Sequence, residues 1–250
     1  MSNLPPTSRV VRNLRKRGLT VLSHDQWGSR RRATYAARRV SRPVHRPADT
    51  CVQHITVTQP SGDFASDVRT VERIGYERFK SGVSYNWVVD MRTGEIAAGQ
   101  PLDAKGTHTV NDKRVPGFSY DQNLVARAIA VVGMPGTPLS DKAEASIVAI
   151  LAAMIEEGEL TPGFDYEPHS RFAEKDCPCD ATRDRMPAIR KAVSASGSPT
   201  SARPARRTRG KRLDAALRQL RKAKGKGNRA EAIQAAKQAI KSIPLLGRKS

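Results

Sequence analysis

The chain has few cysteines, no long apolar run and almost no acidic residues at its two ends. Three cysteines among 250 residues cannot build a disulfide framework, so metal binding or nucleophilic chemistry suits them better. No segment approaches the ~18–20 consecutive apolar residues of a membrane-spanning helix. The basic run Arg12–Arg17 is followed only by the short apolar stretch Leu19–Leu22, whereas a signal peptide needs roughly 7–15 apolar residues. We therefore expect no membrane span, no signal peptide and synthesis into the cytoplasm.

Positive charge is concentrated at the ends of the chain. The formal net charge is +20, made up of +10 over residues 1–50, −4 over 51–194 and +14 over 195–250. Such a distribution predicts one near-neutral folded domain between basic appendages. We expect a basic N-terminal arm over residues 1–18, a folded domain over 19–192, a Ser/Pro/Arg linker over 193–210 and a basic helical hairpin over 211–250.

The middle of the chain has the residue pattern of an α/β fold. Alternating β-branched residues indicate strands, and a 3.6-residue apolar period indicates helices, the clearest of which begins at a Ser140 cap. The resulting order of strands and helices predicts a mixed central β-sheet flanked by helices. The expected strands cover residues 51–58, 84–90, 95–98 and 124–133, and the expected helices cover residues 68–81 and 140–157.

One polar loop carries the residues with the clearest chemical potential. His169 and Cys177 lie eight residues apart, and Lys175 comes two positions before the thiol. An imidazole on the strand near residues 52–56, such as His54, would complete a three-ligand zinc site with an open fourth position, as a catalytic zinc requires. An incidental histidine and cysteine on a surface loop explain the spacing alone equally well.

Several motifs occur in the order found in one enzyme family. Together they cover about residues 21–190, and each is weak by itself. The region resembles the zinc-dependent N-acetylmuramoyl-L-alanine amidases shared by phage lysozyme-type endolysins and peptidoglycan recognition proteins. The matching segments are Leu22–Gly28, Val52–Thr58, Val83–Asp90, Thr93–Gln100, Lys105–His108 with Asn123, Ile129–Gly133, and His169 with Lys175–Pro178.

The resemblance implies a role for particular residues. It implies a zinc ion held by His54, His169 and Cys177, with Tyr85 and Lys175 assisting catalysis. Substrate-binding roles are implied for a further three residues, each with an alternative. His108 could instead be a solvated histidine, Asn123 could cap a turn, and Trp27 could be a core aromatic rather than part of the groove.

The sequence departs from the family pattern at three places. Only one imidazole, His54, stands at the first ligand position, and Cys179 follows Pro178 as a spare or backup thiol. The segment 109–122 is longer than usual, which predicts either a lid or an inserted loop. Cys51 lies at an odd offset from His54 on the same strand, so we expect it on the opposite, buried face.

The implied activity is hydrolysis of the amide bond between N-acetylmuramic acid and the L-alanine of the peptidoglycan stem peptide. A phage endolysin fits best: it would stay in the host cytoplasm until the membrane is permeabilised and then degrade the cell wall. A non-catalytic peptidoglycan-binding protein is one alternative, and a virion-associated lysin with nucleic-acid-binding basic arms is another. The basic ends could also bind anionic cell-wall polymers or be a solvated surface; nucleic acid is less favoured because residues 195–250 contain no aromatic for base stacking.

Overall fold

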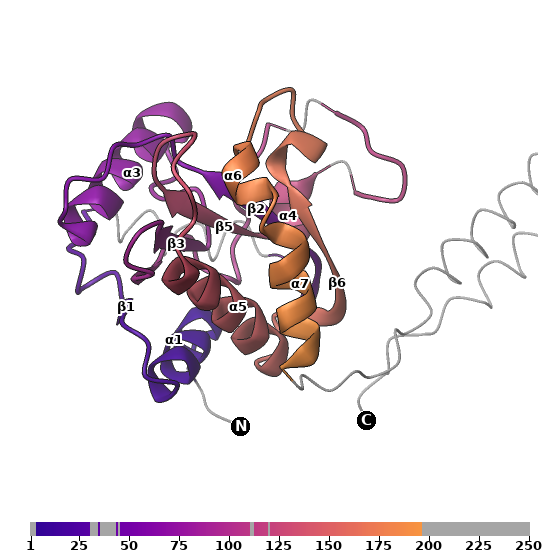
Figure 1. The fold of residues 1–250 in the computed structure, drawn as a ribbon, viewed down its shortest axis with the longest axis horizontal. Helices are drawn as coiled ribbons and strands as arrows, with labels where there is room; N and C mark the ends of the chain where they lie inside the picture. Colours follow the sequence, from indigo (N-terminus) through magenta and orange to yellow (C-terminus); the bar gives the residue numbers. More distant parts are fainter. Residues whose placement is uncertain are drawn as a thin grey trace, which may run out of the picture. The chain divides into compact units, whose positions relative to one another are not determined.

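A six-stranded mixed sheet lies at the centre of the protein (Figure 1). The computed structural model describes residues 4–30, 35, 44, 46–110, 113–119 and 121–196. The strand order is β1-β4-β3-β5-β2-β6, and only the β3–β4 pair is antiparallel. This arrangement confirms the predicted α/β class with a mixed central sheet. The strands are β1 Val21–Leu22, β2 Ala48–Ile55, β3 Trp87–Asp90, β4 Ile96–Ala98, β5 Ala126–Val132 and β6 Leu160–Pro168.

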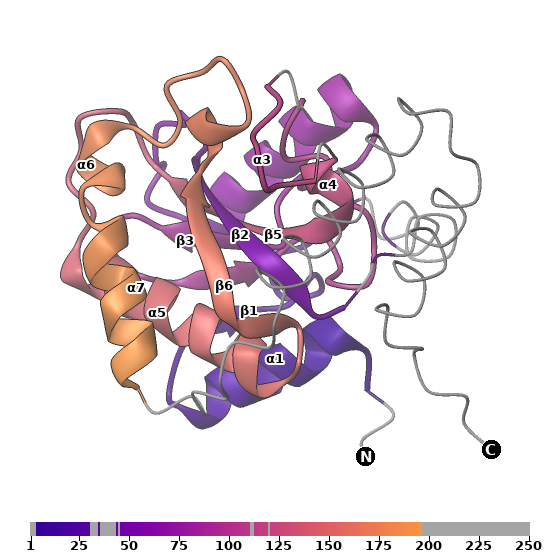
Figure 2. The ribbon, with the colours of Figure 1, turned by 90° about the vertical axis from the view of Figure 1, so that its right-hand side faces the viewer.

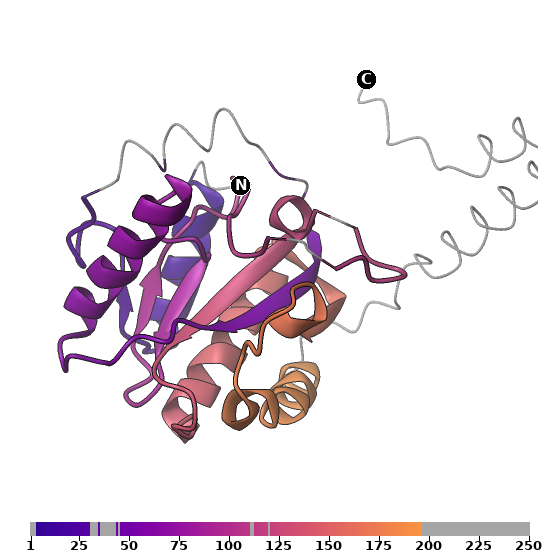
Figure 3. The same cartoon turned by 90° about the horizontal axis from the view of Figure 1, so that it is seen from above.

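Helices cover the two faces of this sheet differently. Along β3, Trp87 and Val89 pack into a core shared with α1, α5 and α7, whereas Val88 points to the opposite face and packs with α3. Figure 3 shows α3 on one side of the sheet and α5 and α7 on the other. The helices are α1 Pro6–Lys16, α3 Phe64–Phe79, α4 Gln122–Val125, α5 Asp141–Glu156, α6 Asp180–Arg183 and α7 Met186–Ala195, with the 3₁₀ turn η1 at His169–Arg171.

The expected N-terminal arm is wrong, because residues 6–16 form the helix α1 and belong to the core. Val10 and Leu14 are fully buried, and α1 packs against α5. Arg9 forms ion pairs with Glu157 and Glu159. The basic composition of this segment hides an apolar stripe at helical spacing, and that stripe ties the segment to the domain.

The folded domain also extends further toward the C-terminus than expected. Helix α7 runs to Ala195, and Val193 is buried in the main core, so the linker cannot begin at residue 193. The predicted helical hairpin at 211–250 lies outside the described residues.

Capping residues fix the first residue of the two longest described helices, and one of these starts was predicted. The Ser140 hydroxyl accepts a hydrogen bond of 3.1 Å from the Ala143 amide and begins α5, as predicted. At α3, Asp63 caps the helix in the same way, so this helix begins four residues before the expected start. None of the helices in the described part of the chain is long and apolar enough to cross a membrane.

Candidate metal centre

Two neighbouring parallel strands bring the histidines together. β2 and β6 pair with Gln53 opposite Pro168, so the next residues along the strands, His54 and His169, lie side by side. Figure 2 shows β2 and β6 adjacent at the edge of the sheet. The ring centroids of the two histidines are 4.4 Å apart, and both side chains are buried. Sheet register therefore juxtaposes residues that are 115 positions apart in the sequence.

A tight loop returns the cysteine to the same place. The Ser170 amide donates a 2.6 Å hydrogen bond to the Cys177 carbonyl, which folds the segment after η1 back on itself. The Ile55 amide at the end of β2 donates to the Cys177 sulfur over 3.5 Å. Cys177 is thus held to β2 through its sulfur and to η1 through its carbonyl.

These three side chains fit a zinc ion. Their ligand atoms all lie within 4.8 Å of one another, and Sγ of Cys177 is 3.9 Å from Nδ1 of His54. Two ligands of a tetrahedral zinc at ~2.0–2.3 Å lie about 3.6 Å apart, so only a small adjustment is needed. Two nitrogens and one sulfur are a donor set typical of zinc and leave one coordination position open.

The protonation states of the ligands have opposite effects on metal binding. Burial lowers the pKa of His54 well below its usual value, and His169 and His108 lower it further. The imidazole is therefore neutral at pH 7 and keeps a lone pair for a metal. Burial raises the pKa of the Cys177 thiol to about 11, although the Ile55 amide opposes this. Since a metal binds the thiolate, metal binding must release this proton.

The two residues expected to assist catalysis lie differently around this cluster. The ring of Tyr85, which precedes β3, is 4.9 Å from the ring of His54. Burial raises the pKa of Tyr85, and the nearby Cys177 raises it further, so the phenol keeps its proton at neutral pH. Lys175 is exposed, and its charge lowers the pKa of Cys177. Tyr85 therefore packs beside the cluster, whereas Lys175 is exposed near Cys177.

His108 joins the cluster as a third imidazole. Its ring is 5.3 Å from that of His54 in an edge-on arrangement, and it is buried rather than solvated. Burial lowers its pKa to about 3, with His169 adding to the effect, so it is neutral at pH 7. A buried neutral imidazole beside the two ligand histidines can accept or donate a hydrogen bond to a bound molecule.

Asn123 positions the loop that carries His108, a structural role like the alternative given for it above. Its side-chain amide donates to the Thr109 carbonyl at 2.6 Å, and its carbonyl oxygen accepts from the Thr109 amide at 3.1 Å. Its own backbone carbonyl accepts from the Gly106 amide at 2.8 Å. Both ends of the side chain are thus used in bracing residues 106–109.

Trp27 is a core residue, which agrees with the core alternative given for it above rather than with a place in a groove. It is fully buried, and its indole N–H donates a 2.9 Å hydrogen bond to the Ala98 carbonyl. It packs with Phe64, Val68 and other residues between α3 and the sheet. The ring and its indole N–H are both buried, so neither is available to a substrate.

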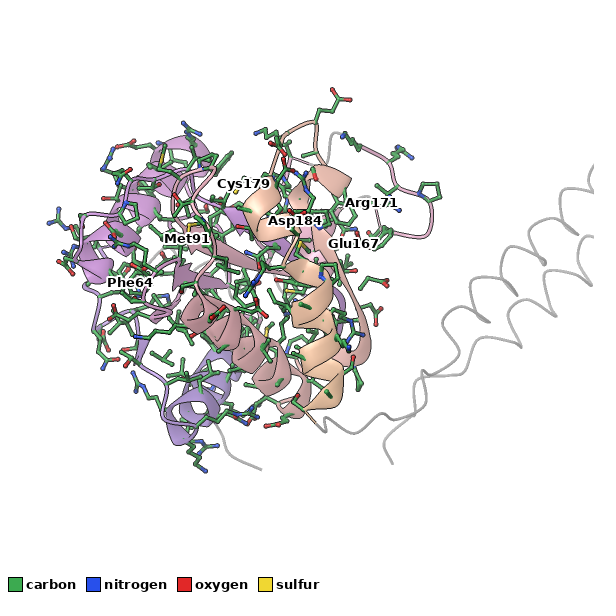
Figure 4. All side chains as sticks on the ribbon, viewed as in Figure 1. Phe64, Met91, Glu167, Arg171, Cys179 and Asp184 are labelled. Carbon is green, nitrogen blue, oxygen red and sulfur yellow. The ribbon has the colours of Figure 1, made fainter. Side chains whose placement is uncertain are left out.

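The other two cysteines lie in the core. Cys51 is fully buried on the α5 side of the sheet, as its odd offset from His54 predicts. Cys179 is also buried, at the start of α6 (Figure 4), and its sulfur is 3.9 Å from the Thr182 hydroxyl. Cys177 is thus the cysteine that approaches the histidines.

Two supporting features were not found from the sequence. The buried amide of Asn86 donates to the Gln100 carbonyl and accepts from the Ala128 amide, which fixes the backbone next to Tyr85. Within the segment 109–122, Phe118 stacks edge-on against Phe172 at 5.2 Å, beside η1. Phe118 therefore packs against the turn that carries His169. An isolated Asn or Phe gives no sequence signal for such long-range contacts.

The arrangement of strands and helices defines a class of fold, that of the peptidoglycan recognition proteins. Drosophila peptidoglycan recognition protein SA is 22% identical to this chain and has a TM-score of 0.52, covering 64% of this chain and 86% of that one. Peptidoglycan recognition protein LE, solved with tracheal cytotoxin, a monomeric diaminopimelic acid-type peptidoglycan, is 17% identical with a TM-score of 0.54, covering 69% and 93%. Drosophila peptidoglycan recognition protein LB is 16% identical with a TM-score of 0.51, covering 73% and 95%.

At these identities the similarity establishes the fold. No protein-family model and no curated protein sequence matches the chain. The expected fold is confirmed, and the activity of this chain depends on its own side chains.

Proposed function

We propose that this protein is a zinc-dependent N-acetylmuramoyl-L-alanine amidase that cleaves between N-acetylmuramic acid and the L-alanine of peptidoglycan. The observation that carries the proposal is the buried cluster of His54, His169 and Cys177 with the protonated phenol of Tyr85 beside it. A protein that only binds peptidoglycan needs neither a metal-binding cluster nor a proton donor next to it. The similar recognition protein LE, solved with a peptidoglycan fragment, supports this substrate class.

Each residue of the site has a distinct role in this proposal. Zinc held by the three ligands would supply Lewis acidity, which polarises the amide carbonyl and acidifies water. Tyr85 donates a hydrogen bond to the oxygen that gains negative charge as the amide is attacked. Lys175, exposed near Cys177, adds positive charge near that oxygen, and His108 orients the substrate through its neutral imidazole.

The biological setting is proposed to be lysis of a bacterial host by a phage. The enzyme would be made in the host cytoplasm and reach the wall after the membrane is permeabilised. Its basic terminal segments would then bind anionic wall polymers rather than nucleic acid.

Mass spectrometry of purified peptidoglycan digested by the full-length protein tests the reaction. We expect new L-alanine amino termini and no new reducing sugar ends. New reducing ends would instead indicate a glycosidase. Binding to peptidoglycan without any new amino terminus, in zinc-loaded protein, would favour the non-catalytic alternative.

Replacing Tyr85 with phenylalanine separates catalysis from metal binding. Because only the hydroxyl is lost, we expect kcat to fall by about 10²–10³-fold, the usual cost of removing one oxyanion donor. Zinc content, measured by plasma mass spectrometry, and KM should change little. Tyr76→Phe on α3 is the matched control and should keep full activity. A Tyr85→Phe protein with normal kcat would remove Tyr85 from the mechanism.

The Lys175→Ala variant should likewise keep its zinc and lose turnover.

A further inference from the structure

A buried glutamine lies next to the first metal ligand on β2. Gln53 is fully buried, and the alternation of the strand places its side chain on the face opposite to that of His54. On this face Cys51 and Ile55, from the same strand, belong to the main apolar core. A buried amide in apolar surroundings is costly unless its donor and its acceptor are both used. The hydrogen-bond partners of Gln53 therefore indicate what the residue does.

Both ends of this amide are paired. The Tyr166 hydroxyl on β6 donates a 2.6 Å hydrogen bond to the Gln53 side-chain oxygen. Burial raises the pKa of Tyr166 well above its usual value, so the phenol keeps its proton and can act as the donor. The Gln53 side-chain nitrogen in turn donates a 2.9 Å hydrogen bond to the His54 backbone carbonyl. The amide therefore connects β6 to the backbone of a metal ligand.

The His54 carbonyl belongs to the same peptide group as the Ile55 amide. That amide donates to the Cys177 sulfur over 3.5 Å. Because a peptide group is planar, a hydrogen bond that fixes its carbonyl also fixes the direction of its N–H. A hydrogen bond accepted by the carbonyl also polarises the N–H at the other end. The hydrogen bonds therefore run in one direction, from the Tyr166 hydroxyl through Gln53 to the Cys177 sulfur.

We propose that Gln53 is a positioning residue of the metal centre, which aims the Ile55 amide at the Cys177 sulfur. Tyr166 in turn holds the Gln53 amide in place. This inference rests on the zinc site of the proposed function but not on the reaction. Removing a hydrogen-bond partner that supports a metal ligand typically weakens metal binding by about 10–100-fold. The β2–β5 ladder also holds this strand, so it should keep its register without the amide.

The zinc affinity of the full-length chain tests the proposal. The zinc-depleted protein is titrated with zinc against a competing chromophoric chelator. We expect Gln53→Leu, which removes both hydrogen bonds at similar side-chain size, to bind zinc about 10–100-fold more weakly than the wild type. Tyr166→Phe should be weakened less, because the Gln53 nitrogen still reaches the His54 carbonyl. The matched control is Ser146→Ala on α5, which removes a buried 2.6 Å hydrogen bond to the Gly94 carbonyl and should bind zinc like the wild type.

Cobalt in place of zinc gives a spectroscopic readout that a loss of stability alone would not change. A hydrogen bond to a thiolate lowers the energy of the sulfur lone pairs and so raises the energy of sulfur-to-cobalt charge transfer. We therefore expect the charge-transfer band of cobalt-loaded Gln53→Leu to move to longer wavelength. The band of Ser146→Ala should stay at the wild-type position.

Different results would refute this inference and the proposed function. If the wild type binds zinc and Gln53→Leu has the same affinity and the same cobalt band, Gln53 does not position the metal centre. Equal losses of zinc affinity in Gln53→Leu and Ser146→Ala would also overturn the inference, because the cause would be a general loss of stability. If the wild type binds neither metal, the metal centre is refuted together with the inference. Zinc binding that depends on Gln53 without any hydrolysis of peptidoglycan would refute the proposed function and support this inference.

Discussion

Cys177→Ser is expected to lose bound zinc and at least about a thousandfold of amidase activity, because a serine hydroxyl stays protonated at neutral pH and is a poor zinc ligand. The Cys177 sulfur is held by the Ile55 amide and lies 3.9 Å from His54. Serine is nearly isosteric, so the loop should keep its path. The loss should therefore be in metal affinity rather than in folding, and circular dichroism should show the same secondary structure.

Cys179→Ser is the control that decides which thiol is the ligand. Cys179 is buried at the start of α6 and lies near Thr182. This variant should keep one zinc per chain and near-normal turnover. If Cys179→Ser lost the zinc and Cys177→Ser kept it, the ligand assignment would be wrong.

Removing the metal should have the same consequence as removing the ligand. A chelator should abolish hydrolysis by the wild-type protein, and added zinc should restore it. Zinc should also raise the melting temperature of the wild-type protein but not of Cys177→Ser, because a ligand that binds only the native state stabilises it by mass action. Hydrolysis that is indifferent to chelation would refute the metal role.

The grouping of His54, His169 and Cys177 was expected from the family resemblance, because the motifs that carry the resemblance are local. His54 lies in a strongly patterned strand, and His169 and Cys177 share one short loop. The helix α5 was predictable for the same reason, since its cap and apolar stripe lie within 18 residues.

Features that depend on distant contacts could not be predicted. The strand β6 is interrupted near its start by Thr161, Pro162 and Gly163, which weaken its alternation, and its pairing with β2 supplies what its sequence does not. For Trp27 and Asn123 the sequence left a functional and a structural role open. Their hydrogen bonds to Ala98 and Thr109 span 71 and 14 residues, and such long-range contacts leave no local sequence signal.

The end of β2 and β6 opposite the metal centre is expected to be the most sensitive point for stability. Glu159, just before β6, has a fully buried side chain that pairs with Arg9 at 2.8 Å and with Arg46 at 2.5 Å. Arg127 on β5 is 1% exposed and lies 4.0 Å from the same carboxylate. Burial lowers the pKa of Arg127 to about 10, and Glu159 opposes that shift. One carboxylate therefore compensates a buried guanidinium and joins four segments of the chain.

Glu159→Gln should lower the free energy of unfolding by about 3–5 kcal/mol, because breaking a buried ion pair leaves an uncompensated charge. Glu156→Gln is the matched control: it also removes a partner of α1, but Glu156 is 41% exposed, so the loss should be at most about 1 kcal/mol. Urea denaturation of the zinc-loaded proteins measures both. The double variant Glu159→Gln/Arg127→Met should recover part of the loss, since it removes the stranded charge as well. Equal effects of the two single glutamine variants would mean that the Glu159 cluster is no more than a surface ion pair.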